Sequence, residues 1–291
     1  MVECIPNFSE GRNAEAVRAI VDAIQSAAGV LLLGWESDAD HNRSVVTFAG
    51  PAEAVMKAAV CGVGKAAELI DLSEHEGVHP RTGAADVIPF VPLEGSSLEE
   101  CVHVAHQAGE HIWDRFGIPV YFYEAAAMTP GRQRLEKVRR KEFDGMPPDV
   151  GAIVSHPTAG ACVVGAREFL IAYNVLLDTP DLAVGQAIAK AIRESSGGFR
   201  YVKSIGLYLE SRGRAQVSIN LTKFAETPLD QVFECIQAEA KRLGASVEDC
   251  ELIGFIPRRA FQMWPAFFER ASNFDSSRII ENRIDRLLDS A

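Results

Sequence analysis

Residues 75–79 have the sequence HEGVH and match the H-E-x-x-H spacing, in which two histidines one helical turn apart bind zinc and the glutamate acts as general base. This chemistry requires a helix that continues through both histidines. Gly77 lies between them and Pro80 follows the second, and proline disfavours the helical conformation in the residue before it. We therefore expect the preceding helix to end near Ile70, with residues 75–79 in a loop that binds no metal.

The same loop is suited to acid–base chemistry. Residues 79–86 (HPRTGAAD) place His79, Arg81 and Asp86 within one turn-rich segment that leads into a strand. An imidazole titrates near neutral pH, so it can accept and then return a proton, while a nearby carboxylate orients it and stabilises its charged form. We predict that His79 is the proton-transfer residue. The alternative is a structured turn without chemistry.

The composition indicates the class of protein to which this loop belongs. With 291 residues, 47% of them hydrophobic, the chain can bury one large core or two modest ones, and we expect two domains. No run of about 18 apolar residues and no signal-peptide pattern is present, so a cytoplasmic protein without a membrane segment is expected. The six cysteines never form C-x-x-C, which favours reduced, buried thiols. A net charge of -11 argues against nucleic-acid partners.

Hydrophobic periodicity predicts the same order of elements in both halves of the chain. In the first half we expect a strand at 2–8, a helix at 13–27, strands at 30–33 and 44–48 around a polar turn at 36–43, a helix opening at 50–51 and a strand at 87–92. In the second half we expect a strand at 169–176, a helix at 184–192, strands at 202–209 and 216–221, a helix opening at 227–230 and a strand at 252–257.

This repeated order predicts an α+β protein of two tandem ferredoxin-like (βαββαβ) lobes, at residues 1–150 and 151–291. A polar stretch at 129–155 joins the lobes, and its basic residues are Arg132, Arg134, Lys137, Arg139, Arg140 and Lys141. Such charge runs are typical of a solvated helix face, and the alternative is a role in steering an anionic ligand.

Several segments, in order along nearly the whole chain, resemble the glutamate formiminotransferase (glutamate formimidoyltransferase) family. They are CIPNFSEGRN at 4–13, NRSVVTF at 42–48, GVHPRTGA at 77–84, IPVYFYE at 118–124, His156-Pro157, GAREFLIAYN at 165–174, QVSINL at 216–221 and Thr227-Pro228-Leu229. The resemblance implies transfer of the formimino group from N-formimino-L-glutamate to N5 of tetrahydrofolate, a one-carbon transfer in histidine degradation. It further implies two ferredoxin-like lobes with the folate in a groove between them, a homodimer, and His79 as general base. We expect a stand-alone transferase, without the cyclodeaminase domain that follows the transferase in some relatives.

The resemblance and the chemistry together select the remaining candidate residues. Carboxylates would stabilise the positive charge on the formiminium nitrogen, and the family has an acidic residue near Glu36, so the candidates are Glu36, Asp38 and Asp40. Substrate and folate both carry carboxylates, which arginines bind in bidentate fashion, and the candidates are Arg43, Arg81 and Arg167. The pterin edge or the substrate amide would be bound by Asn7, Asn174, Gln216 and Asn220. The alternative for these amides is to terminate strands.

Two alternatives keep the fold but change the activity. A formyl group differs from a formimino group only by O in place of NH, so an N-formylglutamate/tetrahydrofolate formyltransferase has the same requirements. A non-catalytic folate-binding protein is the other. Residues 261–268 (FQMWPAFF) depart from the family pattern, and Pro265 is expected to interrupt a helix there.

Overall fold

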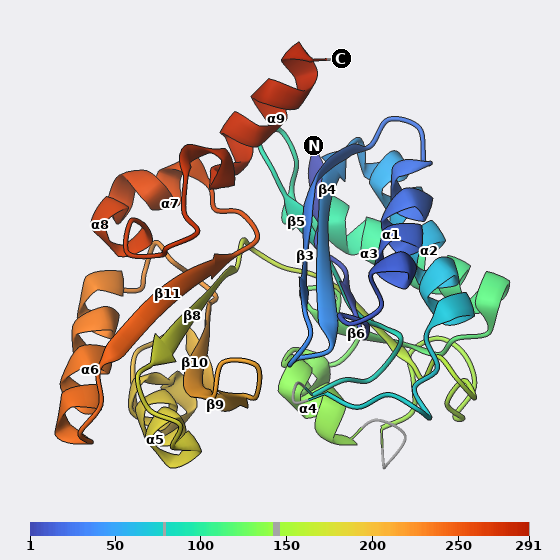
Figure 1. The fold of residues 1–291 in the computed structure, drawn as a ribbon. Coiled ribbons are helices and arrows are strands. Elements are labelled where there is room, and N and C mark those ends of the chain that lie inside the picture. The colour runs from blue at the N-terminus through green and yellow to red at the C-terminus, as the bar shows by residue number, and fades with distance from the viewer. Residues whose placement is uncertain (78–79, 142–145, 291) are drawn as a thin grey trace. The chain divides into compact units, whose positions relative to one another are not determined.

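The computed structural model of the chain describes residues 1–77, 80–141 and 146–290, so His79 lies outside the described residues. The chain divides into two compact units, Met1–Glu168 and Phe169–Ala291. Figure 1 colours the first unit from blue to green and the second from yellow to red. No helix in the described parts of the chain has the length and apolar character needed to cross a membrane.

The described part of the first unit is built on a seven-stranded sheet, with the strand order β1-β4-β2-β5-β7-β6 and β3 paired to β4. Its strands are β1 (Val2–Cys4), β2 (Asn7–Phe8), β3 (Leu31–Asp38), β4 (Arg43–Gly50), β5 (Ala85–Pro92), β6 (Val120–Glu124) and β7 (Cys162–Ala166). The pairs β5–β7 and β6–β7 are parallel and the other pairs are antiparallel. The single strand expected at 2–8 is split into β1 and β2, and Pro6, which has no N–H to donate, lies at the break.

Helices cover both faces of this sheet, to different extents. The helices α1 (Ala14–Gln25), α2 (Ala52–Leu69) and α3 (Leu98–Phe116) lie along one face and share the largest core with it (Figure 1). Asn13 caps α1 by accepting hydrogen bonds from the amides of Glu15 and Ala16. On the other face, Leu135 and Val138 of α4 (Leu135–Lys141) pack against β5, β6 and β7. The short η1 (Pro130–Arg132) precedes α4.

The second unit has a four-stranded antiparallel sheet with the strand order β11-β8-β10-β9. Its elements run β8 (Ile171–Leu177), α5 (Leu182–Ile192), η2 (Glu194–Ser196), β9 (Val202–Leu209), β10 (Arg214–Leu221), α6 (Leu229–Arg242) and β11 (Val247–Ile253). The chain continues with α7 (Arg258–Met263), α8 (Pro265–Phe268), η3 (Ser276–Arg278) and α9 (Ile280–Asp289). A separate core fills this unit, with large side chains such as Tyr173, Phe267 and Phe268 fully buried.

The structure confirms the predicted α+β class with two units. The expected order of strands and helices is present in the second unit and in the first unit as far as β5. The predicted boundary at residue 150 is wrong, because β7 pairs with β5 and β6 and so keeps the chain in the first unit as far as Glu168. Pro265 does interrupt a helix, since α7 ends at Met263 and Pro265 opens α8.

Candidate functional site

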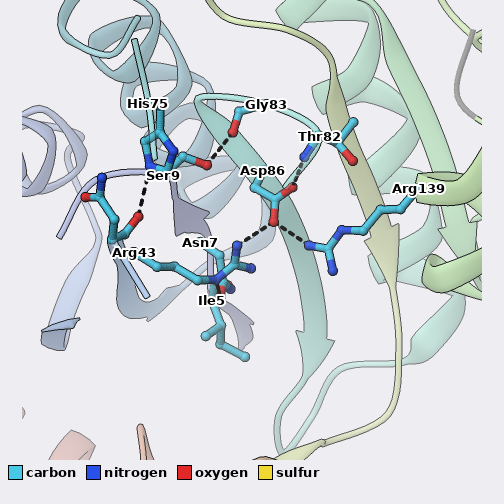
Figure 2. A network of polar contacts seen from close by, with 10 residues as sticks. Ile5, Asn7, Ser9, Arg43, His75, Thr82, Gly83, Asp86 and Arg139 are labelled. Atoms are coloured by element: carbon cyan, nitrogen blue, oxygen red, sulfur yellow. Dashed lines mark hydrogen bonds and ion pairs between the residues drawn. The ribbon is translucent and has the colours of Figure 1, made fainter. Parts of the chain in front are cut away.

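The centre of the candidate site in the first unit is the fully buried carboxylate of Asp86, on β5. Arg43, the first residue of β4, donates from Nη1 to Asp86 Oδ2 at 2.5 Å and from Nε to Asn7 Oδ1 at 3.0 Å. The backbone amide of Thr82 donates to Asp86 Oδ1 at 2.7 Å. Arg139 of α4 donates from Nη2 to the same Oδ2 that accepts from Arg43. Figure 2 shows the two guanidinium groups reaching this one oxygen from different sides.

The electrostatics of this cluster favour an ionised Asp86. Burial by itself opposes the charged form, but Arg43 and Arg139 outweigh it and hold the pKa of the Asp86 carboxyl below its usual value. Burial lowers the pKa of Arg43, with Asp86 opposing this and Arg139 adding to it. The cluster therefore joins two guanidinium groups to one carboxylate.

Asn42 joins three segments beside this cluster. Its Oδ1 accepts from the amide of Gly11 at 3.0 Å, and its Nδ2 donates to the carbonyl of Glu76 at 2.8 Å. Its own carbonyl lies 3.1 Å from His75 Nε2. Asn42 is buried and adopts φ 46°, a left-handed conformation that asparagine tolerates better than most residues. A Cβ on Gly77 would lie 2.6 Å from the carbonyl oxygen of His41, so these two backbones are in direct contact. The loop that leads to His79 is thus held against the β3–β4 turn.

His75 binds a backbone carbonyl, and it does not lie on the helix that the zinc interpretation requires. Since a carbonyl only accepts hydrogen bonds, His75 Nε2 must carry the proton in its contact with Asn42. Burial lowers the pKa of His75, with the Asn42 carbonyl opposing this. As predicted, α2 ends at Leu69, and residues 70–77 are not helical. Among the described residues, no group of three or more His, Cys, Asp or Glu could hold a metal ion.

The segment after His79 is tied to its surroundings by several hydrogen bonds. Arg81 donates from Nη2 to the carbonyl of His75, so its guanidinium holds the loop. Ser9 donates from Oγ to the Gly83 carbonyl at 2.7 Å, as Figure 2 shows, and from its amide to the Ala84 carbonyl at 2.8 Å. A Cβ on Gly83 would lie 1.9 Å from the carbonyl oxygen of Ala161, so glycine is required by this close approach.

The acidic candidates lie beside Arg43 because of the strand register. Asp38 pairs directly with Arg43 and Glu36 with Val45, which also pairs with Asn7 on the other side. Directly paired residues project on the same face of a sheet, so the side chains of Glu36, Asp38, Arg43 and Asn7 share one face. The polar turn expected at 36–43 is shorter than predicted, because β3 extends to Asp38 and leaves only Asp40 of the three acids in the turn. Asp38 Oδ1 accepts from the amide of His41 at 2.8 Å.

Arg167 lies apart from Asp86, at the end of β7 and beside Tyr123. Burial raises the pKa of Tyr123 to about 12, and Arg167 opposes the rise. Arg167 also donates from Nη1 to the carbonyl of Glu168 at 3.0 Å. The side chain is half-buried and lies beside the phenol of Tyr123.

The three amide candidates of the second unit share one face of its sheet. Asn174 of β8 pairs with Ser218 of β10, and Gln216 and Asn220 lie two residues to either side of Ser218. Val217 and Ile219, which alternate with them, face the core. Asn174 and Gln216 are buried while Asn220 is exposed, and the Oε1 atom of Gln216 is buried with no hydrogen-bond partner among the described residues.

The sequence analysis missed the role of Arg139. The basic stretch had been interpreted as a solvated face or a steering device, and Arg134 and Lys137 are indeed exposed. Arg139, by contrast, reaches the buried Asp86. A signal was present, because Leu135, Val138 and Arg139 follow the i, i+3, i+4 spacing of one helix face, and the first two are apolar.

Comparison with known proteins covers almost the whole chain. The family model described as "Formiminotransferase domain, N-terminal subdomain" matches residues 1–167, and "Formiminotransferase domain" matches residues 172–288. A glutamate formimidoyltransferase of Streptococcus pyogenes serotype M1 is 44% identical, and one of Thermoplasma acidophilum is 41% identical, each over 98% of both chains. A formimidoyltransferase-cyclodeaminase of Mus musculus is 42% identical over 92% of this chain and 52% of its own length.

Proposed function

The chain belongs to the formiminotransferase family, and we propose that it transfers the formimino group of N-formimino-L-glutamate to N5 of tetrahydrofolate. The observation that carries this proposal is the 41–44% identity, over 98% of both chains, to enzymes named glutamate formimidoyltransferase. We place the reaction in the cytoplasm, in histidine degradation, with a homodimer as the active form. Tetrahydrofolate is a co-substrate, and no metal takes part.

The reaction needs one proton removed and one supplied. N5 attacks the amidine carbon and loses its proton, the carbon passes through a tetrahedral centre, and the bond to the glutamate nitrogen breaks as that nitrogen gains a proton. In this proposal His79 performs both transfers, since a single imidazole can accept and return the same proton. The described residues on either side of it, Gly77 and Arg81, contact the His41 carbonyl and the His75 carbonyl.

The other candidates take supporting parts in the same reaction. Glu36, Asp38 and Asp40 stabilise the positive charge that develops on the formiminium nitrogen. Arg43, Arg81 and Arg167 anchor carboxylates, with Asn7, Asn174, Gln216 and Asn220 as hydrogen-bonding residues for the pterin or the amide. The pairing of Asp38 with Arg43 supports this division. It sets a carboxylate that can stabilise positive charge at the reacting centre next to a cation that can bind a substrate carboxylate.

The test is a side-by-side assay of N-formimino-L-glutamate and N-formyl-L-glutamate as donors to tetrahydrofolate. We expect turnover with the formimino donor, and a loss of about 100-fold or more in kcat for His79→Ala, the usual contribution of a positioned proton-transfer group. Faster turnover of the formyl donor would identify a formyltransferase instead. Binding of tetrahydrofolate without turnover of either donor would identify a non-catalytic folate-binding protein.

His106→Ala provides the matched control, since His106 lies in α3 and its ring contacts the Ala126 carbonyl at 2.9 Å. Activity of His79→Ala within a few-fold of wild type would refute the proton-transfer role.

A further inference from the structure

The Asp86 cluster contains one more positive charge than negative charge. Arg43 and Arg139 both donate to Asp86 Oδ2, and the exposed fractions of the three side chains are 11%, 17% and 0%. Two guanidinium groups and one carboxylate sum to one net positive charge within this hydrogen-bonded cluster. Asp38, which pairs with Arg43 in the sheet, is 43% exposed and accepts from the His41 amide. A buried charge without a counter-charge is costly, and this cost disappears when an anion binds.

The same cluster has hydrogen-bond donors that remain unused. The Nε atom of Arg139 is buried and has no partner among the described residues. The hydroxyl of Thr82 is likewise buried and unpartnered in the described part of the chain, while the amide of the same residue binds Asp86. In Arg43, by contrast, Nε donates to Asn7 and Nη1 to Asp86. Buried donors are nearly always satisfied in folded proteins, so a ligand acceptor is expected here.

We propose that Arg139, together with Arg43, binds a carboxylate of a glutamyl group, and that Arg139 is a specificity-determining residue. The proposal rests on the function proposed above and adds to it a residue that the family motifs in the sequence did not indicate. A carboxylate fits better than a phosphate, because it carries the single negative charge that balances the cluster. Its two oxygens also match the forked donors of a guanidinium group.

The glutamyl carboxylate has two possible sources, the N-formimino-L-glutamate donor and the glutamate tail of tetrahydrofolate. The experiment separates them by measuring KM for each substrate in wild type, Arg139→Gln and Arg139→Lys. Lys137→Gln is the matched control, because Lys137 is an exposed cation on the same helix. Calorimetric binding of glutamate, tetrahydrofolate and 6-methyltetrahydropterin, which has no carboxylate, accompanies the kinetics.

We expect Arg139→Gln to raise KM or Kd for one carboxylate-bearing ligand about 10- to 100-fold, the usual value of a charge-assisted hydrogen bond. Arg139→Lys keeps the charge but loses the forked geometry, so an intermediate effect is expected. Lys137→Gln should change each KM and Kd by less than 2-fold. Arg139→Gln should change the Kd of 6-methyltetrahydropterin by less than 2-fold. The ligand whose affinity falls identifies the source of the carboxylate.

The proposal is overturned if the affinities of Arg139→Gln for glutamate and tetrahydrofolate stay within 2-fold of wild type. It is also overturned if this substitution weakens the binding of 6-methyltetrahydropterin as much as that of the carboxylate-bearing ligands. It is also overturned if Arg139→Lys, with a wild-type melting temperature, shows wild-type affinity for every ligand. Because the binding arm requires no turnover, a chain that fails to transfer formimino groups yet shows the selective loss in Arg139→Gln refutes only the proposed reaction.

Discussion

Replacement of Asp86 by asparagine is the most informative test of the buried cluster. Asp86→Asn keeps the size of the side chain and an oxygen for the Thr82 amide, but it removes the carboxylate to which Arg43 and Arg139 both donate. Removal of one partner from a buried ion pair leaves uncompensated charge and costs about 3–5 kcal/mol. In a unit of this size, each kcal/mol corresponds to about 2–4 °C, so Tm should fall by roughly 6–20 °C.

The dependence of this loss on pH provides a second check. The pKa of Asp86 is lowered in the folded state, so its contribution to stability is complete above the unfolded value near pH 4 and is lost as pH falls through the lower, folded value. The difference in Tm between wild type and Asp86→Asn should therefore stay constant from about pH 5 to 8 and shrink only in more acidic solution.

Calorimetric melting at several pH values measures both effects, with Asp114→Asn as the control. Asp114 is an exposed carboxylate of α3, so its replacement should shift Tm by less than about 2 °C. A further Arg139→Gln substitution should restore part of the stability lost in Asp86→Asn, because it removes one of the two uncompensated charges. The electrostatic argument would be refuted if Asp86→Asn lowered Tm by less than 2 °C, or if the difference in Tm from wild type changed between pH 5 and 8.

Two further predictions concern backbone positions around the same loop. Asn42→Ala should lower the free energy of unfolding, measured in urea, by roughly 1 kcal/mol more than Asn42→Gly does. Both variants lose the hydrogen bonds to Gly11 and Glu76, but only alanine is strained at φ 46°. Equal losses would contradict this role for the left-handed conformation. Gly83→Ala should cost at least about 1–3 kcal/mol because its Cβ would meet a backbone oxygen at 1.9 Å, whereas Gly131→Ala, with nothing within 4 Å, should stay near wild type. Comparable stabilities for these two alanine variants would show that the Gly83 contact relaxes easily.

Local sequence patterns predicted much of the secondary structure, because apolar spacing and the backbone restrictions of glycine and proline act over a few neighbouring residues. The apolar spacing of Val17, Ile20, Val21 and Ile24 predicted the buried face of α1, and the structure confirms it. The glycine and proline near His79 predicted that α2 would end before the histidines, which the structure also confirms. The length of β3 was underestimated, because polar residues such as Glu36 and Asp38 are allowed on the open face of a strand.

The candidate site was predicted less completely than the fold. Arg43 was expected to bind a substrate carboxylate, yet two of its nitrogens are engaged by Asn7 and Asp86. Arg139 lies 53 residues from Asp86, and no short-range pattern connects the two. The register that sets Asp38 beside Arg43 likewise depends on how β3 pairs with β4.

By itself, the sequence predicted the α+β class, the two-unit organisation, the limits of α1 and α5 to within two residues, and the end of α2 before His75. These properties follow from hydrophobic periodicity and from the backbone restrictions of glycine and proline, which act over a few residues. Only the tertiary structure decided that Asp86 joins two arginines, that Asn42 connects three segments and that the first unit continues to Glu168. Those features depend on contacts between distant residues, where burial and strand pairing set the partner of each charge.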